Sequence, residues 1–288
     1  MKFSIILPSW NNKSYLKLLI ESIQKNSNYK HDINVHLNEG TDGSIDYLKS
    51  VNVKFNHSEK NLGLCKGTNS AATLAETDYF LYSHDDMYFL PDWDIFLEKE
   101  VNKINSNLYY LSGTMIGPIG CGLQKFDFNC GETSDNFDEN KLLSNYKKVP
   151  YFDHQGTHWA PHLIHKTMWN KVGGFSEEFD PGFASDTDLN KKLWNAGVRI
   201  FKGINDFRVY HFGSISLRKK KVLVRNKGNR FFLKKWSISS DLFIKTYLRS
   251  GEVYDGPLKD KPKKNFYFFI EYIKSKIKYF LIKLFSFL

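Results

Sequence analysis

Two adjacent aspartates at the end of a predicted strand are the residues of this sequence best suited to bind a metal ion. The run Tyr79–Tyr82 is typical of a short buried strand, and Asp85 and Asp86 follow it closely. Ligands of open α/β sheets bind beyond the carboxyl ends of the strands. A carboxylate pair in that place can hold a hard divalent cation, which can bind substrate phosphates. The alternative is a turn rich in aspartate that caps the next segment.

A second acidic stretch opens a predicted helix that ends at Gly197. Ser185 and Asp188 have the spacing of a capping box at the start of this helix. Asp186 would interact favourably with the helix N-terminus, but the capping box leaves its side chain without a structural role.

Four histidines, His154, His158, His162 and His165, are spaced so that they could share a helical face and form a metal cluster. Pro161 interrupts any such helix, and no carboxylate or cysteine lies between the histidines. We therefore favour the alternative that one or two of them line a cleft. His211 lies beside a glycine turn, after a strand-like segment.

The elements that must position these residues alternate between strand and helix over the first hundred residues. Strands are predicted at 3–7, 32–37, 51–55 and 79–82, and helices begin at a Ser14 cap, after the turn 38–44 and after 61–69. The short connections predict an α/β fold with a mostly parallel, doubly wound sheet. Residues 108–114 are a further strand candidate, and 117–139 read as a long variable loop.

Charge divides the chain into two unequal parts. The 288 residues carry a net charge of +10. Residues 1–215 hold 22 Lys and Arg against 26 Asp and Glu, whereas residues 216–288 hold 19 against 5. A basic tail of this kind suits nucleic acid, an anionic membrane surface or phosphorylated substrates. The three cysteines have no metal-type spacing and favour a reducing compartment, and the apolar run at the N-terminus is too short for a signal peptide.

The last part of the tail has the pattern of a basic amphipathic helix. Apolar residues at 273, 277, 280, 284 and 288 fall on one side of a helix, and lysines and serines fall mostly on the other. Five charges in residues 266–288 argue against a membrane-spanning helix. A helix that lies in the membrane interface fits better, and a helix packed on the protein core is the alternative.

Five short motifs, in the expected order and at the expected separations, make the chain resemble a family 2 glycosyltransferase of the GT-A fold. The resemblance covers roughly residues 3–217. The motifs are Ile5-Ile-Leu-Pro-Ser-Trp-Asn11, the turn Asn38-Glu-Gly-Thr-Asp-Gly-Ser44, Asn61-x-Gly63 through Asn69, Asp85-Asp86, and Gly173-Gly-Phe-Ser-Glu177 leading to Asp186-Thr-Asp-Leu189.

The resemblance implies an inverting enzyme that uses Mg²⁺ or Mn²⁺ and moves a sugar from a nucleoside-diphosphate sugar to a hydroxyl of a glycan or lipid-linked acceptor. It also implies a role in surface polysaccharide or glycoconjugate synthesis. We expect the enzyme to be cytoplasmic and peripheral at the inner face of the cell membrane, with no nucleic-acid partner. A nucleotidyltransferase on a similar sheet and a nucleic-acid-binding protein with a basic tail are the alternatives, although the glycine-rich loop of the first and a recognition motif for the second are missing.

The resemblance also assigns roles to individual residues. Asp86 and His211 would hold the metal, and Asp186 would be the general base. Glu39 would contact the nucleotide base or ribose, in a turn that departs from the usual pair of aspartates and leaves the base identity open. The full set of residues expected around the donor is Pro8, Ser9, Trp10, Asn11, Glu39, Gly63, Lys66, Asn69, Asp85 and Asp86.

These roles suggest a division of the chain. Residues 1–217 would form the GT-A domain, with a nucleotide-binding half at 1–114 and an acceptor-binding half at 115–217. Residues 218–264 would be a basic loop or linker that could close over the diphosphate, and 265–288 the interfacial helix.

Overall fold

The strands form one mixed sheet with the order β3-β2-β1-β4-β9-β6-β10-β5, in which β7 pairs with β6 and β8 with β10. The computed structural model describes residues 1–118, 125–149, 152–213 and 221–285. The strands are β1 (Ser4–Trp10), β2 (Asp32–Asn38), β3 (Lys54–Ser58), β4 (Tyr79–Tyr82), β5 (Met87–Phe89), β6 (Tyr109–Gly117), β7 (Lys125–Asp127), β8 (His154–Gln155), β9 (His162–His165) and β10 (Ile200–His211).

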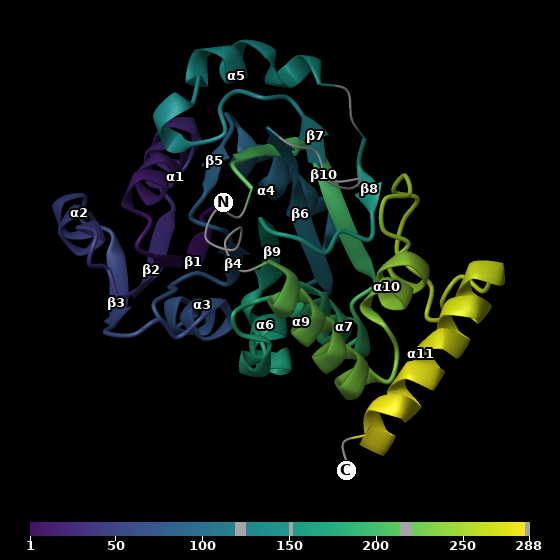
Figure 1. Cartoon of the computed structure of the whole chain (residues 1–288). Coiled ribbons are helices and arrows are strands. Elements are labelled where there is room, and N and C mark those ends of the chain that lie inside the picture. Colours follow the sequence, from purple (N-terminus) through teal and green to yellow (C-terminus); the bar gives the residue numbers. More distant parts are fainter. Residues whose placement is uncertain (119–124, 150–151, 214–220, 286–288) are drawn as a thin grey trace.

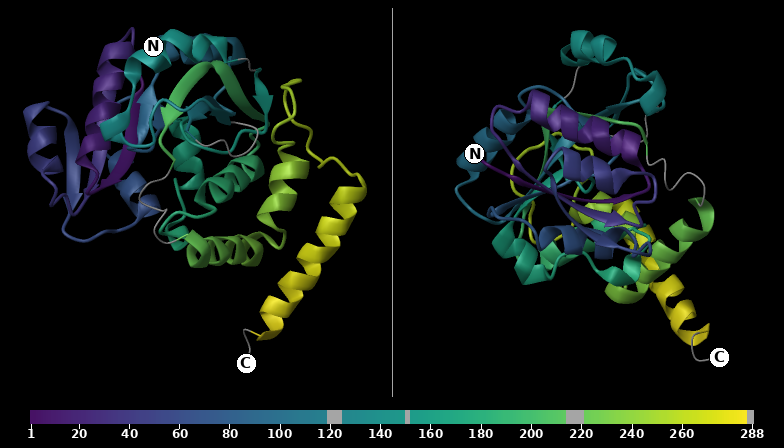
Figure 2. Two further views of the ribbon diagram at one scale, coloured as in Figure 1. Left: turned by 45° about the horizontal axis from the view of Figure 1, so that its top comes forward. Right: turned by 90° about the vertical axis from the view of Figure 1, so that its left-hand side faces the viewer.

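Helices cover both faces of this sheet (Figures 1 and 2). In Figure 1, α1 and α5 lie above the sheet, whereas α3, α6, α7 and α9 lie below it. The helices are α1 (Lys13–Asn26), α2 (Ser44–Ser50), α3 (Leu64–Ala72), α4 (Trp93–Ile104), α5 (Glu139–Asn145), α6 (Lys166–Val172), α7 (Ser185–Asn195), α9 (Lys221–Trp236), α10 (Ser240–Leu242) and α11 (Phe266–Phe285). Short helical turns are η1 (Ser134–Asn136), η2 (Tyr146–Lys148), η3 (Glu177–Phe179) and η4 (Phe243–Tyr247).

The predicted α/β architecture is confirmed. Strands β1 to β4 are mutually parallel, as expected for strand–helix alternation with short connections. The second part of the chain adds β9 antiparallel between β4 and β6, and β10 parallel to β6. Apolar side chains of β1 are fully buried between the helix layers, which accounts for their near-continuous hydrophobic sequence.

Several boundaries differ from the sequence predictions because tertiary contacts override local signals. The third strand is Lys54–Ser58 and not 51–55, because Val51 closes the last turn of α2 through its N–H bond to Tyr47 O at 3.1 Å. Helix α1 begins at Lys13, whose N–H donates to Asp42 Oδ2 at 2.7 Å, so its cap comes from another loop and not from Ser14. The expected loop 117–139 contains β7 and η1.

The region expected to be a basic loop or linker, 218–264, instead folds into α9, α10 and η4 over much of its length. Phe232, Leu242 and Phe243 are fully buried there and belong to the main core. The basic residues 218–220 lie outside the described residues, so the predicted closing loop stays a prediction. These apolar residues are scattered among many lysines, so the sequence pattern did not predict that they belong to the core.

Helix α11 forms as predicted and projects from the body of the protein (Figure 1). Phe268 and Ser275 are buried against the body, and Ser239 N–H donates to Ser275 Oγ at 3.1 Å. The opposite side exposes Ile273, Ile277, Phe280 and Leu284 by 51–65%. Among the described helices, none combines the length and apolar composition needed to cross a membrane.

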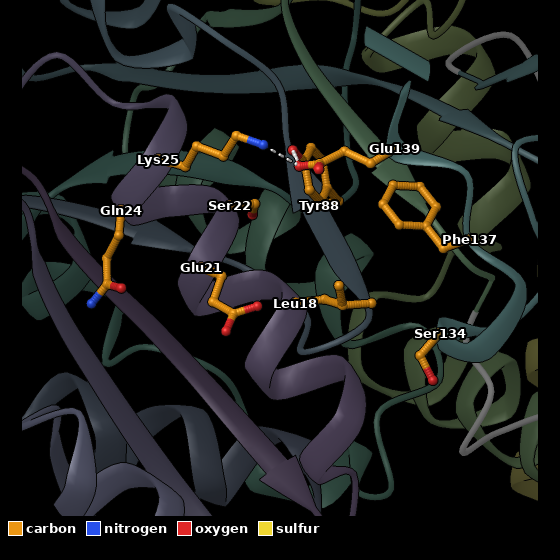
Figure 3. A pocket seen from close by; sticks show the side chains of 9 residues that line it. All are labelled: Leu18, Glu21, Ser22, Gln24, Lys25, Tyr88, Ser134, Phe137 and Glu139. Carbon is orange, nitrogen blue, oxygen red and sulfur yellow. Dashed lines mark hydrogen bonds and ion pairs between the residues drawn. The ribbon is translucent and has the colours of Figure 1, made fainter. Parts of the chain in front are cut away.

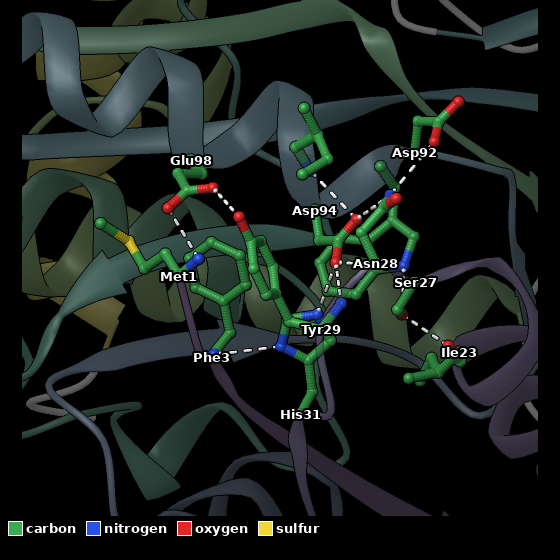
Figure 4. A network of polar contacts seen from close by, with 12 residues as sticks. Met1, Phe3, Ile23, Ser27, Asn28, Tyr29, His31, Asp92, Asp94 and Glu98 are labelled. Carbon is green, nitrogen blue, oxygen red and sulfur yellow. Dashed lines mark hydrogen bonds and ion pairs between the residues drawn. The ribbon is translucent and has the colours of Figure 1, made fainter.

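A buried polar network ties the start of β1 to the α1–β2 connection and to α4 (Figure 4). Asp94 Oδ2 accepts from the N–H groups of Asn28 at 2.7 Å and Tyr29 at 2.9 Å, and lies 3.1 Å from His31 Nε2. Phe3 N–H donates to His31 Nδ1 at 3.1 Å, so the ring donates to Asp94 through Nε2. Burial alone raises the pKa of Asp94, but hydrogen bonds from His31 and Asn28 outweigh it and lower the value to about 2.

We expect Asp94→Asn to lower the free energy of unfolding at pH 7 by about 2–4 kcal/mol, because an amide donor then faces buried donors. The depressed pKa of Asp94 contributes stability above about pH 4, which is lost as pH falls toward 2. The difference between wild type and variant should therefore shrink over that range in denaturant titrations. Asp92→Asn is the matched control, since the Asp92 carboxylate accepts an exposed bond from Asn28. Equal stability of the two variants at pH 7 would contradict the role given to Asp94.

Candidate active site

The loop after β1 and the turn after β2 meet at the carboxyl edge of the sheet. Trp10 Nε1 donates to Glu39 Oε2 at 2.9 Å, and Asn11 Nδ2 donates to the same oxygen at 3.1 Å. Asn11 Oδ1 in turn accepts from Thr41 N–H at 2.8 Å. Parallel pairing places Trp10 opposite Asn38, one residue before Glu39. Three of the residues expected around the donor thus form one contiguous group.

The two adjacent aspartates face different partners. Asp85 Oδ2 accepts from Ser9 Oγ at 2.7 Å, which links the β4–β5 connection to the end of β1. Burial, and then the negative charge of Asp86, raise the pKa of Asp85 to about 7. Asp86 is buried and turns toward the last residue of β10, His211. Pro8, next to Ser9, packs closely against Gly67 of α3.

Asp86 and His211 come together, and His84 joins them. His211 Nε2 lies 3.2 Å from Asp86 Oδ1, and the ligand atoms of His84, Asp86 and His211 all lie within 4.8 Å of one another. Burial lowers the pKa of His84 to about 4, so its imidazole is neutral, which is the form that binds metals. Sequence reasoning missed His84, although it lies only two residues before Asp86. These residue types fit a divalent metal ion.

The N-terminus of α3 is contacted by the side chain of Asp180. Gly63 has a left-handed φ of 95°, and a side chain there would collide with the Asp180 carboxylate. Asp180 accepts from the N–H groups of Cys65 at 2.6 Å and Lys66 at 3.3 Å. The backbone at Gly63 is therefore approached closely by Asp180, and its contact with a nucleotide stays a prediction.

Asn69 also has a structural partner. Its amide donates to Phe175 O at 2.9 Å and accepts from Phe175 N–H at 2.9 Å. Asn69 thus connects α3 to the Gly-Gly-Phe segment that leads to α7, and its contact with the nucleotide stays a prediction. The exposed Lys66 stays a candidate.

Asp186 lies in the first turn of α7 with a buried Oδ1 that has no hydrogen-bond partner among the described residues. Burial raises the pKa of Asp186 to about 7. An unpartnered buried carboxylate costs stability, and such groups are frequent at functional sites.

Tyr82 connects Asp186 with the metal-ligand group. Burial, and then the nearby carboxylate of Asp186, raise the pKa of Tyr82 well above its usual value. The Tyr82 ring also packs edge-on against His84, with centroids 5.5 Å apart. The charge of Asp186 thus acts on Tyr82, the side chain against which His84 of the metal-ligand group packs.

The capping box predicted for Ser185 and Asp188 is wrong. The N-cap of α7 is Ala184, and Ser185 Oγ donates to Gly182 O at 2.6 Å. Asp188 is fully buried and accepts from Ser176 Oγ at 2.6 Å and from Trp236 Nε1 at 2.8 Å. Asp188 therefore anchors α9 to α7.

The four histidines of 154–165 do not form a metal cluster. They lie on β8, in the following loop and on β9, because the segment is not helical. Within the described ranges, the group of three or more possible metal ligands is the one at His84, Asp86 and His211. His162 lines the back of the site instead, with its Nδ1 2.7 Å from Tyr110 Oη and its ring 5.0 Å from that of Tyr82.

A separate cavity of about 650 Å³ lies between α1 and the segment around η1 and α5 (Figure 3). Lys25 forms an ion pair with Glu139 at 2.8 Å, and Tyr88 Oη also donates to that carboxylate. Leu18 and Phe137 supply apolar walls. None of the residues predicted for the active site lines this cavity.

Solved structures with the same fold are known at low sequence identity. Residues 1–349 of S. aureus TarS match with 17% identity, 81% of this chain and 72% of that chain covered, and a TM-score of 0.55. The same fragment in complex with UDP-GlcNAc matches with 16% identity, 84% and 74% covered, and a TM-score of 0.55. GalNAc-T7 with UDP, GalNAc and Mn²⁺ matches with 15% identity, 73% and 43% covered, and a TM-score of 0.55.

The chain covers less than half of the longer TarS structure, 45% of its length. No curated protein sequence matches the chain. The model of the glycosyl transferase family 2 matches residues 4–160, which is more than half of the chain and includes the Trp10–Glu39 and Asp85–Asp86 groups. With the GT-A architecture, this match shows that the chain belongs to glycosyl transferase family 2 and is a glycosyltransferase.

Proposed function

We propose that the enzyme transfers a sugar from a nucleoside-diphosphate sugar to a hydroxyl of a glycan or lipid-linked acceptor, with inversion at the anomeric carbon. The observation that carries the proposal is the Asp186 carboxylate, whose buried Oδ1 has no hydrogen-bond partner among the described residues. Its charge acts on Tyr82, and the His84 ring of the metal-ligand group packs against the same tyrosine. The UDP-GlcNAc bound to TarS and the UDP and Mn²⁺ bound to GalNAc-T7 support this donor class and a metal requirement. The proposal includes that residues 115–217 form the half of the domain that binds the acceptor.

Residues at the edge of the sheet would bind the donor. Glu39, held by Trp10 and Asn11, is placed to accept hydrogen bonds from a base or ribose. Asp86 and His211 would hold a divalent metal, which when bound would neutralise charge on the diphosphate leaving group. Ser9 and Asp85 would keep the neighbouring loop in place through their 2.7 Å hydrogen bond.

Asp186 would supply the proton acceptor on the other side of the transferred sugar. The acceptor oxygen forms a bond to the anomeric carbon while the bond from that carbon to the phosphate oxygen breaks. The hydroxyl proton moves to the Asp186 carboxylate, and the electron pair of the broken bond leaves with the nucleoside diphosphate. A single displacement of this kind inverts the anomeric configuration.

We expect Asp86→Ala to abolish the metal dependence of nucleoside-diphosphate binding, because it removes the buried carboxylate that faces His211. Calorimetry with UDP, with and without Mn²⁺, measures this. Asp46→Ala, on the exposed side of α2, is the matched control and should bind as wild type does. Unchanged metal dependence in Asp86→Ala would refute the metal assignment.

We expect Asp186→Asn to lower sugar transfer by at least the roughly 10²–10⁴-fold typical of a lost general base. In the wild type, kcat/KM should rise with pH to a plateau above about 7, because the raised pKa leaves the carboxylate protonated in acid. The same raised pKa makes ionisation costly in the folded state, so wild-type stability falls as pH rises from about 4 through 7. The variant should therefore gain thermal stability relative to wild type at pH 8.

Asp188→Asn is the matched control for this prediction. Because Asp188 accepts bonds from Ser176 and Trp236 and pairs with Lys235 at 3.1 Å, its variant should lose stability while it keeps kcat near normal. A larger catalytic loss in Asp188→Asn than in Asp186→Asn would move the base assignment to Asp188.

We propose that α11 docks the enzyme on an anionic membrane surface at the cytoplasmic side. Its exposed apolar stripe includes Ile273, Ile277 and Phe280 and lies opposite the side packed on the protein. Lys274, Lys276, Lys278 and Lys283 flank the stripe, and each lysine near an anionic surface contributes on the order of 1 kcal/mol. A surface of this kind would be unfavourable in water.

We expect the triple variant Ile273→Ser, Ile277→Ser and Phe280→Ser to lose vesicle binding by at least about tenfold while its melting temperature stays unchanged. Sedimentation with phosphatidylglycerol vesicles measures binding, and pure phosphatidylcholine tests the need for negative charge. Leu108→Ser with Val253→Ser, also exposed apolar residues, is the control that should bind as wild type does. A collapsed melt of the triple variant would show instead that this side of α11 is packed in solution.

A further inference from the structure

The imidazole of His84 is held beside Asp86 and His211 with no other evident role. Its Nε2 is buried and has no hydrogen-bond partner among the described residues. The ring of His84 packs against Tyr82, and its centroid is 5.6 Å from that of His211. A buried polar atom without a partner lowers the stability of the folded state, so a ligand that satisfies it is favoured.

We propose that His84 is a third protein ligand of the catalytic metal, so that two imidazoles and one carboxylate hold the ion. This inference rests on the proposed function, because it concerns the metal that assists donor binding. The three ligand atoms already lie within 4.8 Å of one another. Two atoms each about 2.1 Å from one ion are at most about 4.2 Å apart, so the widest separations shorten on binding, which side-chain rotation provides.

The ligand types determine which metals bind well. Mg²⁺ prefers oxygen ligands and water, whereas imidazole nitrogen favours first-row transition metals. With Asp86 as the single carboxylate of the group, the site selects Mn²⁺ or Co²⁺ over Mg²⁺. If Asp86 and His211 alone bound the metal, water would fill the remaining positions and the preference would be smaller.

The arrangement is preorganised by the residues behind it. Tyr82 separates His84 from His162, whose Nδ1 is engaged with Tyr110 Oη at 2.7 Å. The backbone of Asp86 is fixed by its carbonyl, which accepts from Phe212 N–H at 3.1 Å. The ligands therefore come from two segments that the sheet already holds together, and little order is lost on metal binding.

The test measures metal binding directly on the full chain with UDP. Calorimetry gives the affinities for Mn²⁺ and Mg²⁺, and electron spin echo spectroscopy of bound Mn²⁺ counts coupled imidazole nitrogens. We expect two coupled imidazoles in the wild type and one in His84→Gln, with Mn²⁺ affinity at least about tenfold lower in the variant. His84→Asp replaces nitrogen by oxygen and should keep metal binding while it narrows the preference for Mn²⁺ over Mg²⁺.

His165→Gln is the control, since His165 is buried on β9 and bonds to Thr167 at 2.9 Å, away from the site. One coupled imidazole in the wild type, or unchanged Mn²⁺ affinity in His84→Gln, would overturn the inference. Loss of metal-dependent UDP binding in Asp86→Ala would then still support the proposed function, so the two failures are distinguishable. If His84→Gln does not fold, the wild-type spectrum and the His84→Asp affinities decide.

Discussion

The antiparallel pairing of β10 with β5 is the contact on which the arrangement of the active site depends. It sets His211 opposite Met87, the residue that follows Asp86, and it brings Phe212 N–H to the Asp86 carbonyl. A register shift between Ile204 and Arg208 lets the long β10 strand pair with β6 on one side and still reach β5 on the other. The segments that carry the predicted metal ligands are therefore held together by backbone hydrogen bonds.

Two aspartates of α7, only two residues apart in the chain, lie in different surroundings. Asp188 is surrounded by donors from Ser176, Lys235 and Trp236, so its charge is compensated and it holds α9 in place. The buried oxygen of Asp186 has no such donors in the described part of the chain. Burial raises the pKa of that carboxylate to about 7. A base with a pKa near neutral pH can both accept and release a proton.

The basic C-terminal region has two parts that pack differently, which its composition alone does not reveal. Phe232, Leu242 and Phe243 complete the core below the sheet, so the region up to η4 is part of the folded enzyme. Helix α11 then leaves the body with only a narrow contact side around Phe268 and Ser275. Its outward side is apolar and bordered by lysines, a combination that suits the interface of an anionic membrane.

The sequence by itself determined the α/β architecture, the family resemblance, the strand at 79–82 and the residues at the sheet edge. These depend on local periodicity and on short motifs, which survive without knowledge of distant contacts. Tertiary structure alone decided the partners of each polar side chain. Asn69 bonds to Phe175, and Asp180 lies against Gly63. The cap of α1 comes from Asp42, and the four histidines of 154–165 lie on different elements. Tertiary structure also brought His211 of β10 to His84 and Asp86 in the β4–β5 connection, because the pairing of β10 with β5 joins segments that lie far apart in the chain.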